Sequence, residues 1–205
     1  MSHIGQWVLL EACRQARAWS DSGLGVVPVA VNVSAAEFGD TDFISKVRAV
    51  LIATGVEPSN LELEVTESIL MQDAESTVRT LSALKAMGVR LAIDDFGTGF
   101  SSFTYLRRFP VDTLKLDQSF VQEITESGDA TIITAMISIG KSLKQRVIAE
   151  GVETQVQLDF LQRHGCDEGQ GYYFSHPLAA REIRKILGAG FEKEWKSSSE
   201  TVAIA

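Results

Sequence analysis

The sequence has few cysteines and no long hydrophobic run, and both absences narrow the class of protein. Cys13 and Cys166 are the only cysteines among 205 residues, and neither has a partner at the spacing of a metal site. This usage is typical of a reducing cytoplasm. No apolar run reaches the roughly 18 residues needed to span a bilayer, and no signal peptide opens the chain. We therefore expect a cytoplasmic domain without a membrane span, which could be part of a longer protein.

Positive charge is also scarce. Lys and Arg number 19 against 27 Asp and Glu, which gives a formal net charge of −8. A protein that works by neutralising a nucleic-acid polymer is therefore disfavoured. The three histidines, His3, His164 and His176, lie in unrelated contexts and are weak candidates for ligands or catalytic groups.

The composition is that of one globular domain. The hydrophobic fraction is 45% and the charged fraction 22%, and a chain of this length can bury a substantial core. We assign residues 1–190 to one domain and residues 191–205 to a polar C-terminal tail without a core pattern.

Two adjacent carboxylates at the end of an apolar run are the most informative local feature. Asp94 and Asp95 follow Leu91-Ala92-Ile93, and a loop containing Gly97 and Gly99 comes next. Buried carboxylates need a compensating partner, and Mg²⁺ is bound by oxygen ligands in sites that keep open positions for water or phosphate. The segment therefore indicates a metal site for chemistry at phosphorus. The alternative is an ordinary strand followed by a turn, because Asp and Gly are common turn residues.

Short β-rich segments alternate with segments of helical periodicity. Strands are predicted at 26–33, 61–66, 89–95, 113–117, 146–150 and 169–174. Helices are predicted at 4–19, 42–54, 74–87, 130–143, 155–164 and 179–187, with a helical turn at 103–107. This alternation indicates an α/β fold with parallel strands and crossover helices. An open doubly wound sheet and a closed barrel are both compatible with six strands.

The placement of polar residues favours the barrel. Five of the six predicted strands carry a polar group at or near their carboxyl end, and the sixth begins beside Gln170. In chain order, these groups are Asn32, Glu64, the pair Asp94 and Asp95, Lys115 and Glu150. Barrel enzymes build their sites from the carboxyl ends of many strands, whereas an open sheet uses the few strands beside its switch point.

Each of these residues also has a structural interpretation. Asn32 could belong to a turn or open a helix, and Glu62 and Glu64 could lie on a solvated strand face. Lys115 could form a salt bridge with Asp117 or another acid. Glu153 could cap a helix.

The ordered motifs resemble those of the EAL domain family of bacterial cyclic di-GMP phosphodiesterases. The resemblance runs from about Ile4 to about Leu187 and rests on Asn32-Val33-Ser34, Leu63-Glu64-Val65-Thr66-Glu67-Ser68, Asp94-Asp95-Phe96-Gly97-Thr98-Gly99, Leu114-Lys115-Leu116-Asp117, Ala149-Glu150-Gly151-Val152-Glu153-Thr154 and Gln170-Gly171-Tyr172. It implies a modified eight-stranded TIM-like (β/α) barrel and hydrolysis of cyclic di-GMP to linear pGpG with Mg²⁺ or Mn²⁺.

The resemblance also implies residue roles. Asn32, Glu64 and Asp94 would hold one metal, and Asp94, Asp95 and Glu150 would surround a second. Lys115 would contact the attacking water and the phosphate, and Glu150 is the implied general base; the catalytic set is Glu150, Lys115 and Asp95. Gln170 would support the site, and Glu67 would anchor a mobile loop, which the family couples to dimerisation and which contains Phe96, Gly97, Thr98, Gly99, Ser101 and Ser102.

The Glu-Ala-Leu segment that names the family should precede the helix containing Trp7, and the chain begins too late to include it. About six of eight strands are therefore expected, without one metal-ligating glutamate and one substrate-contacting arginine. Because unpaired strand edges promote association, we expect a dimer or higher oligomer through the edge at 26–33. A sensory or GGDEF domain could precede this segment in a longer protein.

Two further functions remain open. The missing ligand is compatible with a catalytically impaired domain that binds cyclic di-GMP or acts as an interaction or dimerisation module. A different metal-dependent barrel enzyme, acting on a carboxylate or an enolate, is a weaker alternative.

Overall fold

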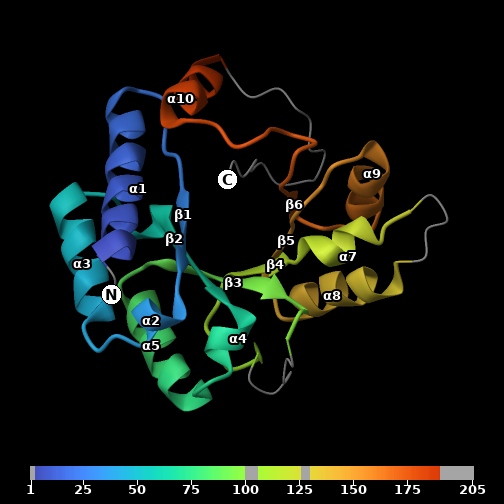
Figure 1. Ribbon diagram of the computed structural model, residues 1–205, viewed down its shortest axis with the longest axis horizontal. Coiled ribbons are helices and arrows are strands. Elements are labelled where there is room, and N and C mark those ends of the chain that lie inside the picture. Colours follow the sequence, from blue (N-terminus) through green and yellow to red (C-terminus); the bar gives the residue numbers. More distant parts are fainter. Residues whose placement is uncertain (1–2, 100–105, 126–129, 190–205) are drawn as a thin grey trace.

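The computed structural model describes residues 3–99, 106–125 and 130–189. Helices and strands alternate along this part of the chain (Figure 1). The strands are β1 (Val29–Val33), β2 (Leu61–Thr66), β3 (Arg90–Phe96), β4 (Thr113–Leu116), β5 (Arg146–Ala149) and β6 (Glu168–Gly169). The longer helices are α1 (His3–Asp21), α3 (Phe43–Thr54), α5 (Ala74–Ala86), α8 (Thr131–Ser142), α9 (Gln155–Arg163) and α10 (Ala180–Ala189). Short helical segments are α2 (Ala35–Phe38), η1 (Pro58–Asn60), α4 (Glu67–Leu70) and α7 (Gln118–Gln122).

All six strands form one parallel sheet in the order β1-β2-β3-β4-β5-β6. A doubly wound sheet would reverse its strand order at a switch point, whereas consecutive order is that of a barrel wound in one direction. Within the described residues β1 and β6 do not pair with each other, so the sheet stays open. The prediction of an incomplete α/β barrel is confirmed.

The central strands are buried on both faces. Every residue of β4 is buried, as are the first five residues of β2. Glu62 and Glu64 are each 6% exposed, so the interpretation of a solvated strand face is wrong. In a parallel sheet covered by helices, neither strand face meets bulk water.

The outer strand β1 is different. Val31 and Val33 are buried against the helical layer, but Ala30 and Asn32, which point the other way, are exposed. The inner face of the sheet is therefore accessible beside β1. At the far end of the chain α10 lies near the end of α1 (Figure 1), and its Gly188 packs close to Leu24.

Two predicted strand boundaries need correction. The strand predicted at 26–33 begins at Val29, after Gly25 and Pro28, and Val26 is 65% exposed. Gly25 has a positive φ and Pro28 lacks a backbone donor.

The strand predicted at 169–174 is wrong beyond its first residue, because β6 is Glu168–Gly169. At Gly171 (φ 153°) a Cβ would lie 2.3 Å from the backbone of Val152, and the N–H of Tyr173 donates to the carbonyl of Val152. The chain therefore turns around Val152. The aromatic run that resembled a strand contains Tyr172, whose side chain is exposed.

Most other boundaries agree with the predictions to within two residues, and α2, α4 and α7 were not predicted. Ser34 and Thr154 begin α2 and α9 with capping boxes, so the helix cap near Glu153 is Thr154. Most of the predicted turn at 103–107 and the whole tail at 191–205 lie outside the described residues.

Candidate metal and catalytic site

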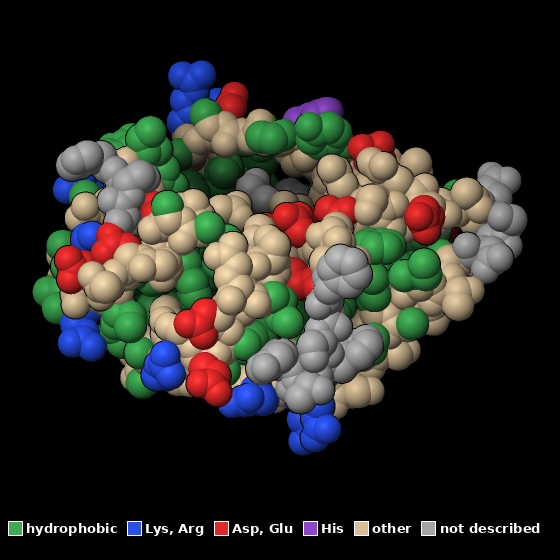
Figure 2. Space-filling model, turned by 60° about the horizontal axis from the view of Figure 1, so that its bottom comes forward, with side chains coloured by type: hydrophobic (Ala, Val, Ile, Leu, Met, Phe, Trp, Pro, Cys, Tyr) green, Lys and Arg blue, Asp and Glu red, His purple; other side chains and the backbone are tan. Residues whose placement is uncertain are grey.

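Charged side chains from β2, β3 and β4 and from the residue directly after β5 meet at the carboxyl end of the sheet. The ammonium of Lys115 lies 2.8 Å from Glu64 Oε2, 3.1 Å from Asp94 Oδ1 and 2.7 Å from Glu150 Oε1. The side chain of Lys115 is only 5% exposed. We call Glu64, Asp94, Asp95, Lys115 and Glu150 the strand-end cluster. In Figure 2, acidic side chains gather beside a hollow in the surface.

The partner of Lys115 is thereby established. Asp117 accepts hydrogen bonds from the backbone and hydroxyl of Ser119 and begins α7, whereas Lys115 pairs with carboxylates from β2, β3 and the end of β5. Of the salt bridges considered for Lys115, those with other acids are therefore formed and the one with Asp117 is not.

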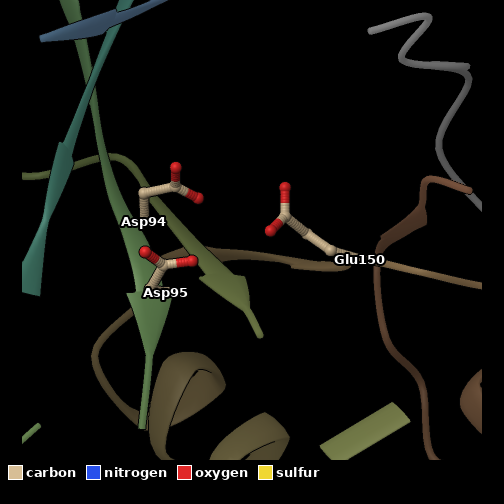
Figure 3. A group of neighbouring side chains, drawn as sticks. All are labelled: Asp94, Asp95 and Glu150. Atoms are coloured by element: carbon tan, nitrogen blue, oxygen red, sulfur yellow. The ribbon is translucent and has the colours of Figure 1, made fainter. Parts of the chain in front are cut away.

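The backbone of β3 explains how two consecutive aspartates reach one site. Neighbouring side chains of a regular strand point to opposite faces. Here the pairing of β3 with β4 shifts register between Ile93 and Phe96, and Asp95 has a φ of 52°. Bulges next to active sites can redirect a side chain, and a left-handed non-glycine residue is uncommon. Figure 3 shows the carboxylates of Asp94, Asp95 and Glu150 directed toward one space.

This space has the donors of a divalent cation site. One carboxylate oxygen from each of Asp94, Asp95 and Glu150 lies within 4.8 Å of the others. Asp94 Oδ1 is buried and has no hydrogen-bond partner in the described part of the chain, although it is ion-paired with Lys115. Hard oxygen donors are those preferred by Mg²⁺ and Mn²⁺. The residues therefore fit such an ion.

The electrostatics of the strand-end cluster also favour a cation, because three carboxylates contact one ammonium and a fourth, Asp95, lies beside Asp94 and Glu150. Burial favours the neutral amine of Lys115, but Glu64, Glu150 and Asp94 outweigh this effect and raise its pKa. Burial raises the pKa of Glu64 and of Glu150, with Lys115 opposing the shift in both cases. The cluster has more negative charge than Lys115 can balance.

Asp95 is influenced by a residue that the sequence analysis did not assign to the site. Burial raises the pKa of Asp95, and the charges of Asp94 and Asp117 raise it further. Asp117 lies two positions after Lys115, so alternation along the strand was the available signal for its proximity. The sequence analysis included Asp117 in a family motif, but the one role that it considered for this residue was a salt bridge with Lys115.

The loop after β3 is attached to Glu67. This buried glutamate begins α4, and its Oε2 accepts the backbone N–H of Gly97 at 2.9 Å. A Cβ on Gly99 would lie 2.8 Å from Glu67 Oε1. Thr98 bonds through its hydroxyl to the carbonyl of Asp95, and Phe96 is buried. Ser101 and Ser102 lie outside the described residues.

Asn32 and Gln170 lie at the two ends of the sheet. Asn32 lies within β1, so it belongs neither to a turn nor to a helix start, and it pairs in register with Glu64. Its side chain is exposed. Gln170 follows β6, where its N–H donates to Ala149 and its carbonyl accepts from Val152. These backbone bonds place Gln170 next to the segment that leads into Glu150.

A second charged group lies nearer the amino ends of β2, β4 and β5 and includes a residue of β6. Arg146 is 2.9 Å from Glu62 Oε2 and 3.1 Å from Glu168 Oε1, and Thr113 donates to Glu62 at 3.0 Å. Burial raises the pKa of Glu168, with Arg146 opposing the shift. We call Glu62, Thr113, Arg146 and Glu168 the floor cluster. Sequence analysis considered only Glu62 of this set.

No helix in the described ranges is both long enough and apolar enough to cross a lipid bilayer.

Comparison with known proteins gives a consistent family. The family model of the EAL domain matches residues 1–177. A Pseudomonas aeruginosa protein named bifunctional diguanylate cyclase/cyclic di-GMP phosphodiesterase MucR is 46% identical over 181 residues, which are 88% of this chain and 26% of that protein. The chain spans about a quarter of the length of the curated relatives that it matches.

Solved structures agree. The structure of the MucR phosphodiesterase in complex with c-di-GMP has a TM-score of 0.84 at 46% identity and aligns with 88% of this chain and 73% of that chain. The crystal structure of the EAL domain of Mycobacterium smegmatis DcpA has a TM-score of 0.86 at 38% identity, with 92% and 85% covered. Because sequence, sheet order and overall structure agree over most of its length, this chain belongs to the EAL domain family.

Proposed function

We propose that this chain is the hydrolytic domain of a cyclic di-GMP phosphodiesterase, which opens one phosphodiester bond to give linear pGpG. The observation that carries the proposal is the group of Asp94, Asp95 and Glu150 carboxylates beside the buried ammonium of Lys115. The relatives named above supply the substrate, since one is named a cyclic di-GMP phosphodiesterase and its structure contains c-di-GMP.

The donor set supports Mg²⁺ or Mn²⁺ as the cofactor. Asn32, Glu64 and Asp94 would hold one ion, and Asp94, Asp95 and Glu150 a second. When bound, such ions acidify water and neutralise charge on the phosphate.

The protein groups have separate roles in this proposal. Glu150 would accept a proton from the attacking water, because its carboxylate lies beside the space that the ion and this water would share. Lys115 would donate to a phosphoryl oxygen, where a fixed buried cation stabilises developing negative charge. Asp95 would complete the donor set, Gln170 would support the segment that carries Glu150, and Glu67 would hold the loop through the amide of Gly97.

The proposal extends to the surroundings of the domain. The domain would act in the bacterial cytoplasm, as a dimer, and within a longer protein that carries a sensory or GGDEF domain. The match covers only 26% of the MucR protein, which supports a longer parent protein. The exposed inner face beside β1 supports association into a dimer.

A non-catalytic function is the second candidate. The exposed side chain of Asn32 on the outer strand favours it, because a ligand at an open edge is less constrained than one inside a closed barrel. In this case the chain would bind cyclic di-GMP, or a partner protein, without hydrolysing the nucleotide.

One experiment separates the two functions. The purified chain is incubated with cyclic di-GMP and Mg²⁺ or Mn²⁺, and pGpG is measured by chromatography. Steady product that Asp94→Ala abolishes would establish hydrolysis. Nucleotide binding without product would support the non-catalytic binding function. If the chain neither hydrolyses nor binds cyclic di-GMP, both nucleotide-dependent functions are rejected.

A matched pair of variants locates the chemistry. Glu64 and Glu62 lie two residues apart on β2 and are equally buried. We expect Glu64→Gln to reduce turnover by about 100-fold or more. Glu62→Gln, in the floor cluster, is expected to keep turnover while lowering stability.

A further inference from the structure

Gly97 is held by contacts from two parts of the fold. Its φ is 101°, and its N–H donates to Glu67 Oε2 at 2.9 Å. A Cβ at this position would lie 2.2 Å from Met136 Cε and 2.9 Å from Phe120 Cε2. Glu67 follows β2, whereas Met136 comes from α8 and Phe120 from α7. The positive φ therefore favours glycine here, and the terminal atoms of Met136 fill the space that a Cβ would occupy.

The Gly97 contacts bear directly on Asp95. Only Phe96 separates the two residues, and Asp95 has the unusual φ of 52°. The hydroxyl and the backbone N–H of Thr98 both donate to the carbonyl of Asp95, at 2.9 and 3.3 Å. Residues 95–98 therefore form one tight turn. A displacement of Gly97 would change the backbone that directs the Asp95 carboxylate toward Asp94 and Glu150.

Met136 differs from its buried neighbours on α8. Ile133 and Ile137 are each 1% exposed and pack in the core, but neither is among the atoms nearest to the Cβ position of Gly97. Met136 reaches Gly97 with its terminal methyl group and sulfur. An unbranched thioether side chain is well suited to fill such an irregular gap beneath a backbone turn.

We propose that Met136 is a positioning residue for the divalent cation site, acting through Gly97 on the conformation of Asp95. The expected effect on hydrolysis rests on the proposed function. The expected effect on the conformation of Gly97 and Asp95 rests on geometry alone. Truncating Met136 would leave a cavity beneath Gly97, and glycine is the residue most able to relax into it. The Gly97–Glu67 hydrogen bond and the direction of the Asp95 carboxylate would then be lost together.

The test compares three variants of the whole chain. Met136→Ala removes the contact, Met136→Leu restores most of its volume, and Ile137→Ala creates a cavity in the same helix away from Gly97. Three quantities are measured: hydrogen exchange of the Gly97 amide by NMR, affinity for Mn²⁺ alone by calorimetry, and the Mn²⁺ concentration that gives half-maximal hydrolysis of cyclic di-GMP. Thermal unfolding shows whether the two alanine variants are comparably destabilised.

For Met136→Ala we expect Gly97 exchange to accelerate and Mn²⁺ affinity to fall, each by about tenfold, with a matching rise in the Mn²⁺ requirement and little change in the KM for cyclic di-GMP. Met136→Leu should return these values to within about threefold of the wild type. Ile137→Ala should lose stability without changing them.

The outcomes separate this proposal from the proposed function. Equal changes in Met136→Ala and Ile137→Ala would overturn the positioning role, because general destabilisation would then suffice. Unchanged Gly97 exchange and Mn²⁺ affinity in Met136→Ala would overturn it as well. If the wild-type chain makes no pGpG, hydrolysis by this chain is rejected, while amide exchange and Mn²⁺ affinity still decide the role of Met136.

Discussion

The strand-end cluster and the floor cluster both have residues on β2, on β4 and on β5 or its carboxyl end, yet their charge balances differ. In the floor cluster one guanidinium and one hydroxyl bind two carboxylates. In the strand-end cluster a single ammonium lies among four carboxylates, one of them on a left-handed backbone. Burying excess charge is costly unless another charge arrives. The comparison separates a small excess of negative charge in the floor cluster from a larger excess in the strand-end cluster, where we propose that a cation binds.

Removing Lys115 should have the largest effect. Lys115→Met leaves Glu64, Asp94 and Glu150 buried without a cation, and we expect the free energy of unfolding to fall by about 3–5 kcal/mol in metal-free buffer. Urea denaturation with and without Mn²⁺ checks this. Because a divalent ion can replace the missing positive charge, saturating Mn²⁺ should restore part of the loss, whereas an equal loss with and without Mn²⁺ would contradict a cation site.

Removing Arg146 should have a smaller effect. The side chain of Arg146 is 28% exposed, so water compensates part of the loss. For Arg146→Met we expect a loss of about 2 kcal/mol, measured by the same urea denaturation. Mn²⁺ should raise the stability of this variant as much as that of the wild type. If Mn²⁺ stabilised Arg146→Met more than the wild type, the proposal that only the strand-end cluster binds a cation would be contradicted.

Neutralising Glu150 should change the free energy of unfolding least of the three substitutions, and it should raise this free energy where the other two lower it. The pKa of Glu150 is raised in the folded protein, so its ionised form destabilises the metal-free fold at neutral pH. We expect Glu150→Gln to stabilise the metal-free protein at pH 7, by less than Arg146→Met destabilises it. The gain should shrink as the pH falls through the raised pKa, because the wild-type carboxyl then becomes protonated as well.

The control for this pH dependence is Glu168→Gln in the floor cluster. Burial raises the pKa of Glu168 too, so the stability gain of Glu168→Gln over the wild type should also shrink as the pH falls. The Mn²⁺-induced rise in melting temperature should disappear in Glu150→Gln and persist in Glu168→Gln. Loss of the Mn²⁺ effect in both variants would show that the two clusters are not independent.

Much of the architecture was predictable because it depends on local patterns. Alternating strand and helical periodicities predicted most elements. The exceptions have tertiary causes. The aromatic segment after Gly169 turns because Gly171 packs on the backbone of Val152, and this contact is invisible in a linear pattern.

The sequence by itself determined which strands end in polar residues and, through the order of the motifs, the family to which the chain belongs. The tertiary structure decided how those residues are grouped. It divided Glu62 and Glu64 between two clusters, gave Lys115 its three carboxylate partners, turned Asp94 and Asp95 toward one space and brought Met136 beneath Gly97. Periodicity is a property of neighbouring residues, whereas register, a bulge and a left-handed residue depend on distant strands and helices that fix the backbone.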